Sequence, residues 1–161
     1  MQRTMFWVWI LVISRTSAQQ MKCVSESKYY IPNFTANWFK ATEYCKYLGM
    51  RLAEITTPEE QAKLASFIQS SDKYNAKTTQ IWIGRNDLAE EGNFYWHDTG
   101  LGLSYTFWGE GNPDNSGDDE NCVEIRYVPP GWTWHWNDRI CYAKRFFACE
   151  NTEHGRGILI L

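Results

Sequence analysis

Oxygen-bearing side chains gather around two cysteines in the last third of the sequence, and this pattern constrains the fold more than any other feature. If Cys122 and Cys141 form a disulfide, three carboxylates and two amides can converge on one point. Hard oxygen donors without Cys or His suit Ca²⁺ better than a transition metal. Pro113 stands between two of the donors, and a cis bond before it would turn both toward the same ion. The five donors are Asn112, Asp114, Glu120, Asn137 and Asp138.

The first 18 residues are typical of a secretory signal peptide. Arg3 precedes a short apolar run over residues 6–13, and the small residues Thr-Ser-Ala end the segment at position 18. The alternative is a membrane anchor, but the run is far shorter than the roughly 20 apolar residues that cross a bilayer. We therefore expect a secreted protein without membrane insertion. Residues 19–27 would precede its single domain, and residues 152–161 would follow it.

The composition argues against several partners and activities. The formal net charge of −3 becomes more negative once Arg3 and Arg15 are removed, which argues against nucleic acid or anionic membranes as partners. Nine Trp in a chain that is 16% aromatic suit a compact core of short strands. The sequence has neither a His-Glu-x-x-His zinc motif nor a Gly-x-Ser-x-Gly elbow, and its three histidines are scattered. We expect no catalysis.

Five cysteines in an exported chain predict disulfides and leave one cysteine over. Any four of them allow three pairings. We favour Cys45 with Cys149, which would close nearly the whole domain and contribute about 4–5 kcal/mol by loop entropy. The second pair, Cys122 with Cys141, would clamp the segment that carries the oxygen donors. Cys23 then remains, and an unpaired thiol near the mature N-terminus favours a disulfide-linked dimer with itself or with a related chain.

Two helices are predicted in the first half of the domain. Apolar residues recur at helical spacing over residues 38–48, and Gly49 marks a stop. The sequence Thr-Pro-Glu-Glu at residues 57–60 is a capping box with Pro at the first helical position, which predicts a second helix through about Gln69. The buried face of this helix would consist of Leu64, Phe67 and Ile68.

Short strands surround a long irregular segment. Strands are predicted at residues 28–32, 81–84, 123–128, 133–136 and 146–150, and a short apolar stretch covers residues 50–55. Residues 86–121 show no sustained period, and such a long irregular segment in a compact domain is usually functional or disordered. Because the segment ends at a predicted disulfide and holds many acids, we favour a functional loop. The fold class is α+β, with no internal repeat and one domain over residues 28–151.

The order of these motifs resembles the C-type lectin domain. The resemblance rests on the helix with Cys45, Trp-Ile-Gly at residues 82–84, the x-Pro-x triplet, Glu-Asn-Cys-Val-Glu-Ile at 120–125, Trp-Asn-Asp at 136–138, and Cys149. It covers residues 28–151 and implies small antiparallel sheets, two helices and a long Ca²⁺-binding loop, all stapled by disulfides. The chain is similar to the short, single-domain secreted lectins of invertebrates.

The resemblance implies that the five donors form a sugar-binding Ca²⁺ site. Its partners would be glycans on microbial, cell-surface or secreted glycoconjugates. Family members commonly carry Glu-Pro-Asn, associated with mannose-type sugars, or Gln-Pro-Asp, associated with galactose-type sugars, whereas residues 112–114 here are Asn-Pro-Asp. The amide comes before the acid, as in the galactose type, which we therefore expect. The alternative is a protein-interaction module of the same fold without sugar binding, although all five positions keep an oxygen donor.

The same resemblance suggests a second, supporting Ca²⁺ site that shares Glu120. Its side chains would come from the start and the end of the long loop. Asn stands at two of these positions, where acids are common in the family. The residues are Asp87, Glu91, Asn115 and Asn121.

Two further features lie outside the ion sites. Trp132, Trp134 and Trp136 alternate along a predicted strand, which favours the core. The alternative is that Trp132 or Trp134 stacks on a sugar face. Asn33 begins an N-glycosylation sequon, Asn-Phe-Thr, which predicts a glycan at this position.

Overall fold

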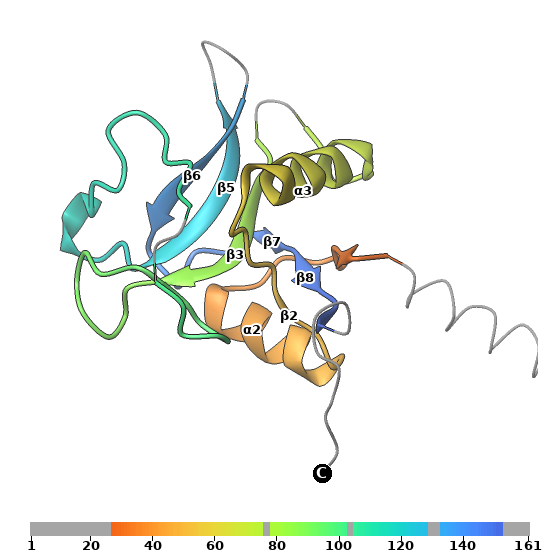
Figure 1. The fold of residues 1–161 in the computed structure, drawn as a ribbon, viewed down its shortest axis with the longest axis horizontal. Coiled ribbons are helices and arrows are strands. Elements are labelled where there is room, and N and C mark those ends of the chain that lie inside the picture. Colours follow the sequence, from red (N-terminus) through yellow and green to blue (C-terminus); the bar gives the residue numbers. More distant parts are fainter. Residues whose placement is uncertain (1–26, 76–77, 103–104, 129–132, 153–161) are drawn as a thin grey trace, which may run out of the picture.

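Two small sheets and two helices make up the chain in the computed structural model, which describes residues 27–75, 78–102, 105–128 and 133–152 (Figure 1). The predicted signal peptide, Cys23, Trp132 and nearly all of both terminal segments lie outside these residues. Within the described ranges, the two helices are too short and too polar to cross a membrane. The α+β class with two helices and small antiparallel sheets is confirmed.

The strands form one sheet of three and one of five. In the smaller sheet, β8 pairs antiparallel with a strand on each side; the bounds are β1 Tyr29–Tyr30, β2 Arg51–Leu52 and β8 Cys149–Glu150. In the larger sheet four strands follow the order β4-β3-β5-β6, and β7 pairs parallel with β3. Its bounds are β3 Gln80–Asn86, β4 Tyr95–Trp96, β5 Cys122–Val128, β6 Thr133–Arg139 and β7 Phe146–Phe147.

Both helices begin and end close to where local sequence signals predict. Helix α2 spans Trp38–Tyr47, and Gly49 follows with a φ of +72°, a conformation that costs glycine little. Helix α3 spans Pro58–Ser70, one residue beyond the predicted end. The Thr57 hydroxyl accepts a hydrogen bond from the Glu60 N–H at 3.2 Å, as a capping box requires.

Each helix covers a different face of the larger sheet. Helix α3 buries Leu64 and Ile68 in the cluster that contains the inward side chains of β5 and β6. Helix α2 packs with Trp82 of β3 on the other face. Both predicted disulfides are present: Cys45–Cys149 ties α2 to β8, and Cys122–Cys141 ties the start of β5 to the segment after β6.

Two predictions about strands were wrong in detail. Residues 146–150 do not form one strand, because β7 pairs with β3 whereas β8 pairs with β1 and β2 in the other sheet. The long segment 86–121 is also less irregular than predicted, since it contains β4 and a 3₁₀ turn, Ser116–Asp118.

Gly84 allows the two sheets to meet, because a Cβ on this residue would lie 2.9 Å from the Leu52 carbonyl oxygen.

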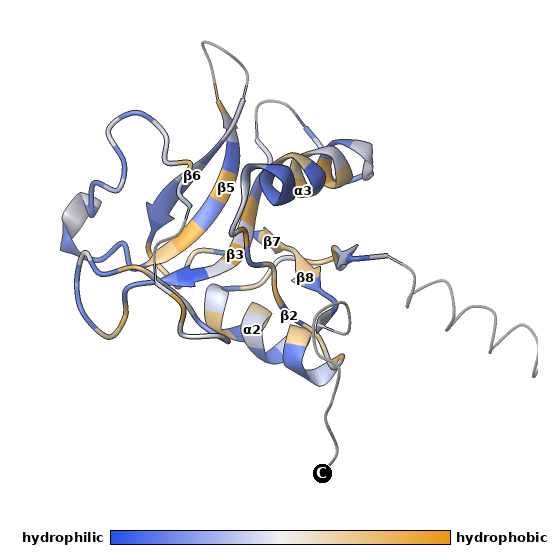
Figure 2. Ribbon diagram, viewed as in Figure 1, coloured by the Kyte–Doolittle hydropathy of each residue, from blue (hydrophilic) through white to orange (hydrophobic). Residues whose placement is uncertain are grey.

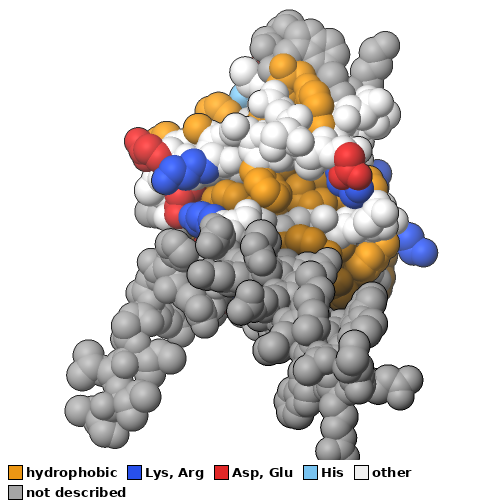
Figure 3. All heavy atoms as spheres, turned by 90° about the vertical axis from the view of Figure 1, so that its right-hand side faces the viewer, with side chains coloured by type: hydrophobic (Ala, Val, Ile, Leu, Met, Phe, Trp, Pro, Cys, Tyr) orange, Lys and Arg blue, Asp and Glu red, His pale blue; other side chains and the backbone are white. Residues whose placement is uncertain are grey.

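The molecule has a polar end and a more apolar end. Figure 2 shows that the loops beside β5 and β6, and much of β6 itself, are hydrophilic, whereas β5 and β3 carry apolar residues. Figure 3 shows hydrophobic side chains at the surface on the side that carries β1 and the end of α3. A shallow, mostly apolar hollow between Tyr29, Ala62 and Phe67 lies on this side. The predicted ion ligands therefore lie at the polar end, away from the most apolar surface.

Candidate functional site

The pairing of β5 with β6 positions three of the five predicted ligands. Asn137 on β6 lies directly opposite Glu124 on β5, and Asp138 follows it along the same strand. Glu120 precedes β5, so it approaches the same end of the strand pair. The disulfide Cys122–Cys141, with a Cα–Cα distance of 5.1 Å, clamps this end. Two strand partners and one covalent link thus hold the acids together independently of the loop conformation.

Three of the predicted ligands form a carboxylate cluster. Asp114, Glu120 and Asp138 each offer an oxygen that lies within 4.8 Å of the others. Asp138 is fully buried, and its Oδ2 accepts hydrogen bonds from the backbone N–H of Asp114 at 2.9 Å and of Asn115 at 2.7 Å. The backbone of the loop is therefore anchored on one acid while the side chain of Asp114 remains exposed. Such a set of hard oxygens fits a divalent cation, in particular Ca²⁺.

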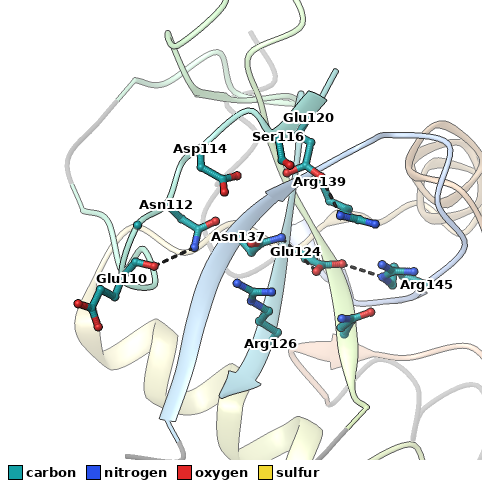
Figure 4. Close-up of a pocket in the computed structure, with 12 residues that line it drawn as sticks. Glu110, Asn112, Asp114, Ser116, Glu120, Glu124, Arg126, Asn137, Arg139 and Arg145 are labelled. Carbon is teal, nitrogen blue, oxygen red and sulfur yellow. Dashed lines mark hydrogen bonds and ion pairs between the residues drawn. The ribbon is translucent and has the colours of Figure 1, made fainter. Parts of the chain in front are cut away.

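The two amides complete the set of five. Figure 4 shows Asn112 and Asn137 close to Asp114 along one opening. The Nδ2 of Asn112 donates to the Glu110 carbonyl at 3.4 Å, and the Nδ2 of Asn137 donates to the Glu124 carboxylate at 3.3 Å. Because the nitrogen atoms are engaged, the amide oxygens are the atoms that can face a cation. The Asn112–Pro113 peptide bond is cis.

Burial and mutual repulsion make the carboxylate cluster electrostatically strained. Burial is the largest cause of a raised pKa at Glu120, and the neighbouring Asp138 and Asp114 raise it further. The guanidinium of Arg139 acts in the opposite direction, since its Nη1 lies 2.8 Å from the Glu120 Oε1. A second positive charge within the cluster would relieve the remaining repulsion. The electrostatics therefore favour a bound cation.

Three of the four residues predicted for the second ion site also come together. The Asn121 amide lies 3.2 Å from both the Asp87 Oδ1 and the Glu91 Oε2, with its nitrogen as the natural donor. Asp87 is buried, which raises its pKa, and the charge of Glu91 contributes in the same direction. The fourth residue, Asn115, has a different partner: its Oδ1 accepts a hydrogen bond from the Glu120 N–H at 2.9 Å. Asn115 thus supports Glu120.

The core position that was favoured for Trp134 is confirmed, and the alternative of sugar stacking by this residue is wrong. Trp134 is only 5% exposed and packs in the core against Tyr74 and Tyr127, so it offers no ring face to a sugar. Trp136 is fully buried as well, which agrees with alternation along the strand. Trp132 lies outside the described residues.

Sequence reasoning missed a different aromatic pair near the ligands. The rings of Phe107 and His135 are stacked, with centroids 4.8 Å apart, and Phe107 is 37% exposed. Both Asn112 and His135 lie close to Gly109, where an added Cβ would meet them at 3.4 and 3.5 Å. The sequence could have predicted the position of His135, because the alternation that buries Trp134 and Trp136 places His135 on the outer face of β6.

Four of the five predicted ion ligands line one end of an open groove, whereas Asp138 is buried and is not part of the lining. The volume of the groove is about 420 Å³, within the range of roughly 300–1,000 Å³ that is typical of small-ligand sites. The other end continues across the outer faces of β6, β5 and β3 (Figure 4). Its lining is strongly polar and comprises Gln80, Glu110, Gly111, Asn112, Asp114, Ser116, Glu120, Glu124, Arg126, Asn137, Arg139 and Arg145.

Comparison with known proteins agrees with this geometry. A family model described as the lectin C-type domain matches residues 34–151, most of the chain. The chain belongs to the C-type lectin family. It is 37% identical to salivary C-type lectin 1 of Aedes albopictus, over 91% of this chain and 97% of that protein. It is 41% identical to C-type lectin 16 of Aedes aegypti, over 83% of this chain and 88% of that protein.

The fold is also that of solved C-type lectin structures. The cow C-type carbohydrate-recognition domain of CD23, determined in the presence of a GlcNAc2Man3 oligosaccharide, aligns with a TM-score of 0.63. It is 32% identical, and the match covers 76% of this chain and 87% of that chain. The resemblance to single-domain invertebrate C-type lectins is therefore confirmed. C-type lectin domains generally bind Ca²⁺ and are in general not enzymes.

Proposed function

We propose that the protein is a secreted, calcium-dependent lectin. The observation that carries this proposal is the convergence of Asp114, Glu120 and Asp138 beside two asparagine amides in an open, polar groove. C-type lectin domains that have lost sugar binding would have no reason to keep five oxygen donors around one point. Solvent exposure of the groove suits a ligand that must be captured from outside.

Five side chains would hold the ion. These are Asn112, Asp114, Glu120, Asn137 and Asp138. Bound Ca²⁺ would supply free coordination positions for two vicinal sugar hydroxyls. Beside it, the carboxylates can accept hydrogen bonds from the hydroxyls, and the second N–H of the Asn112 amide can donate to them, whereas both N–H groups of Asn137 are engaged. The side chains thus decide which arrangement of hydroxyls fits.

The order of these groups favours galactose-type sugars over mannose-type sugars. Asn112 places an amide first and Asp114 places an acid second, which is the order of the galactose-type triplet. The asparagine is one methylene shorter than the usual glutamine, which weakens this fit. The exposed Phe107 and the outer face of His135 could compensate, because galactose-type sugars present an apolar face to aromatic rings.

The second acidic cluster would support the first. Asp87 and Glu91, with Asn121 between them and Glu120 shared, would bind a weaker second Ca²⁺. Because Asp87 follows β3 whereas Asn121 leads into β5, occupation of this site would fix both ends of the long loop.

Secretion, glycosylation and dimer formation complete the proposal. A related protein carries the name salivary C-type lectin, which agrees with the signal-like first 18 residues. Asn33 is exposed, as a glycosylated residue must be, and an N-glycan amidase should increase gel mobility of protein from a eukaryotic secretory cell. Cys23 is left over by the two disulfides and should produce a covalent dimer on non-reducing gels. Two sites per dimer would increase avidity for clustered glycans.

The central test is calcium-dependent glycan binding. Calorimetry should detect one dominant Ca²⁺ site with a dissociation constant on the order of 10⁻⁴–10⁻³ M. The protein should bind a galactose resin in Ca²⁺ and elute with EDTA or free galactose. Glu120→Gln should abolish both properties, whereas Glu110→Gln, an exposed acid at the rim of the same groove, should keep them. Partner binding that survives EDTA would favour the interaction-module alternative, and elution by mannose alone would refute the galactose preference.

A further inference from the structure

Arg126 lies at the far end of the groove, on β5, two residues along the strand from Glu124. On the outer face of β5, Glu124 and Arg126 alternate with residues that point to the core. Glu124 lies opposite the ligand Asn137, and Arg126 lies opposite His135 on the next rung. Two residues along a strand span about 7 Å. Arg126 is therefore about one sugar ring away from the ion ligands.

Arg126 differs from the two other arginines in the groove. Arg139 is paired with Glu120 at 2.8 Å, and Arg145 is paired with Glu124 at 2.7 Å. Within the described residues Arg126 has no ion pair, which distinguishes it from these two, and its Nε, like that of Arg139, is buried without a hydrogen-bond partner. A guanidinium with a desolvated, unsatisfied donor is costly unless an anion completes it. Its planar fork matches the paired oxygens of a carboxylate or a sulfate.

The neighbours of Arg126 can complete an anion site. In the sheet register Gln80 on β3 and His135 on β6 lie on either side of it, and both carry side-chain donors. The Nε2 of His135 contacts the Thr133 hydroxyl at 2.6 Å, which helps to hold the ring. The one acid on the adjacent rung, Glu124, is neutralised by Arg145. Two guanidinium groups, Arg126 and Arg145, therefore lie beside this one acid, so one positive charge at this end of the groove is not balanced by Glu124.

We infer that Arg126, with Gln80 and His135, forms a subsite for an acidic substituent of the glycan, either a sulfate or a carboxylate. The inference rests on the proposed function and narrows its ligand to acidic glycans. One sugar would bind at the ion ligands, and the anionic group would lie on the same residue or on the next one along the chain. Ion-dependent capture and charge recognition would then act on one ligand at two places in one groove.

The test compares three glycans that share one neutral galactose-type disaccharide. One is unmodified, one carries a sulfate and one carries a uronic carboxylate. Binding is measured in Ca²⁺ at about 0.15 M salt, where surface charges are screened beyond about 8 Å. We expect the wild-type protein to bind at least one acidic form roughly tenfold more tightly than the neutral form. The two acidic forms show which anion the subsite prefers.

Variants locate the effect. Arg126→Gln should bring the ratio of acidic to neutral affinity close to one, and Arg126→Lys should retain part of the preference because it keeps the charge. Lys144→Gln removes an exposed charge outside the groove and should keep the full ratio. Thermal melting checks that every variant is folded.

The outcomes separate the inference from the proposed function. Equal affinities for all three glycans, or a preference that survives in Arg126→Gln, would overturn the acidic subsite while calcium-dependent binding of the neutral glycan stands. If the protein binds none of the glycans in Ca²⁺, the proposed function fails and the subsite fails with it.

Discussion

The two faces of the β5–β6 strand pair are chemically opposite, although they are built from alternating residues of the same strands. Toward the core, Val123 and Trp136 are fully buried among apolar side chains. Toward the groove, Asn137 and Arg126 meet acids, amides and solvent. Because the side-chain period of a strand is two, one sequence can encode a scaffold and a binding site at once. The exception is the predicted ligand Asp138, which lies opposite Val123 on the inward face and is fully buried, so the ion site reaches the edge of the core.

The inner face gains stability from contacts that the outer face lacks. The rings of Trp96 and Trp108 both contact Trp136 edge to face, with centroids 5.7 and 5.8 Å from it. Arg85 is fully buried over the rings of Trp96 and Trp136 and donates to the carbonyl oxygens of Phe94 and Tyr105, which anchors the long loop. On the outer face, burial raises the pKa of Glu120 and of Glu124, so their charged forms are disfavoured. Apart from Asp138, stability and binding are therefore divided between the two faces of the strand pair.

The largest expected effect comes from breaking the inner face. Trp136→Ala should lower the free energy of unfolding by about 3–5 kcal/mol, because it opens a cavity among several rings and leaves the Gln61 amide oxygen without its 3.0 Å donor. Urea denaturation measures this change. The adjacent His135→Ala on the outer face should cost less than about 1 kcal/mol. Equal losses in the two variants would refute the division between the faces.

The next largest effect is the increase in the free energy of unfolding that calcium binding should produce. With a dissociation constant on the order of 10⁻⁴–10⁻³ M, about 10 mM Ca²⁺ should stabilise the wild-type fold by about 1.4–2.7 kcal/mol. Glu120→Gln should remove this increment while leaving the protein folded in EDTA. Glu110→Gln is the matched control and should keep the increment. Thermal melts with and without Ca²⁺ measure all three proteins, and an unchanged increment in Glu120→Gln would remove Glu120 from the ligand set.

A smaller effect concerns pH in the absence of calcium. The folded-state pKa of Glu120 is raised above the ordinary value of 4.5, so the folded state binds the proton more tightly than the unfolded state. The contribution of Glu120 to stability should therefore increase as the pH falls through its folded pKa and level off below about 4.5. The difference in melting temperature between wild type and Glu120→Gln in ion-free buffer isolates this contribution. A difference that does not change between pH 7 and pH 4 would contradict it.

Local signals predicted the scaffold well, and long-range register decided what they could not predict. The capping box at residues 57–60 and the stop at Gly49 depend on neighbouring residues, and both were correct. The division of residues 146–150 between two sheets depends on partners more than 60 residues away, which a local pattern does not contain. The short strand β4 pairs with β3 over only two residues and left no detectable period.

In the candidate site, too, local sequence predicted some features, whereas others depend on contacts between distant residues. The ligand types and their link to Cys122 predicted a shared ion site, and the structure brings the carboxylates of Asp114, Glu120 and Asp138 close together. Alternation correctly favoured a core position for Trp134, so its alternative role in sugar stacking is wrong. The roles of Arg139 and Arg145 depend on which acid each one meets across the groove, and sequence order does not give that information.

The smallest expected effect decides whether Asp87 stabilises the scaffold or helps to bind calcium. Asp87 is buried at the end of β3 and accepts a hydrogen bond from the Gly92 N–H at 2.8 Å, so it could serve the scaffold alone. If it instead helps to bind a second Ca²⁺, Asp87→Asn should weaken calcium binding at the primary site by about fivefold, since the two sites share Glu120 and one loop. The exposed Glu90→Gln is the control and should change nothing. Hydrogen exchange of residues 86–121 should slow in Ca²⁺ for the wild type and slow less for Asp87→Asn. A variant that unfolds more easily but binds Ca²⁺ with unchanged affinity would assign Asp87 to the scaffold, because a merely structural acid changes stability without changing the ion equilibrium of the folded state.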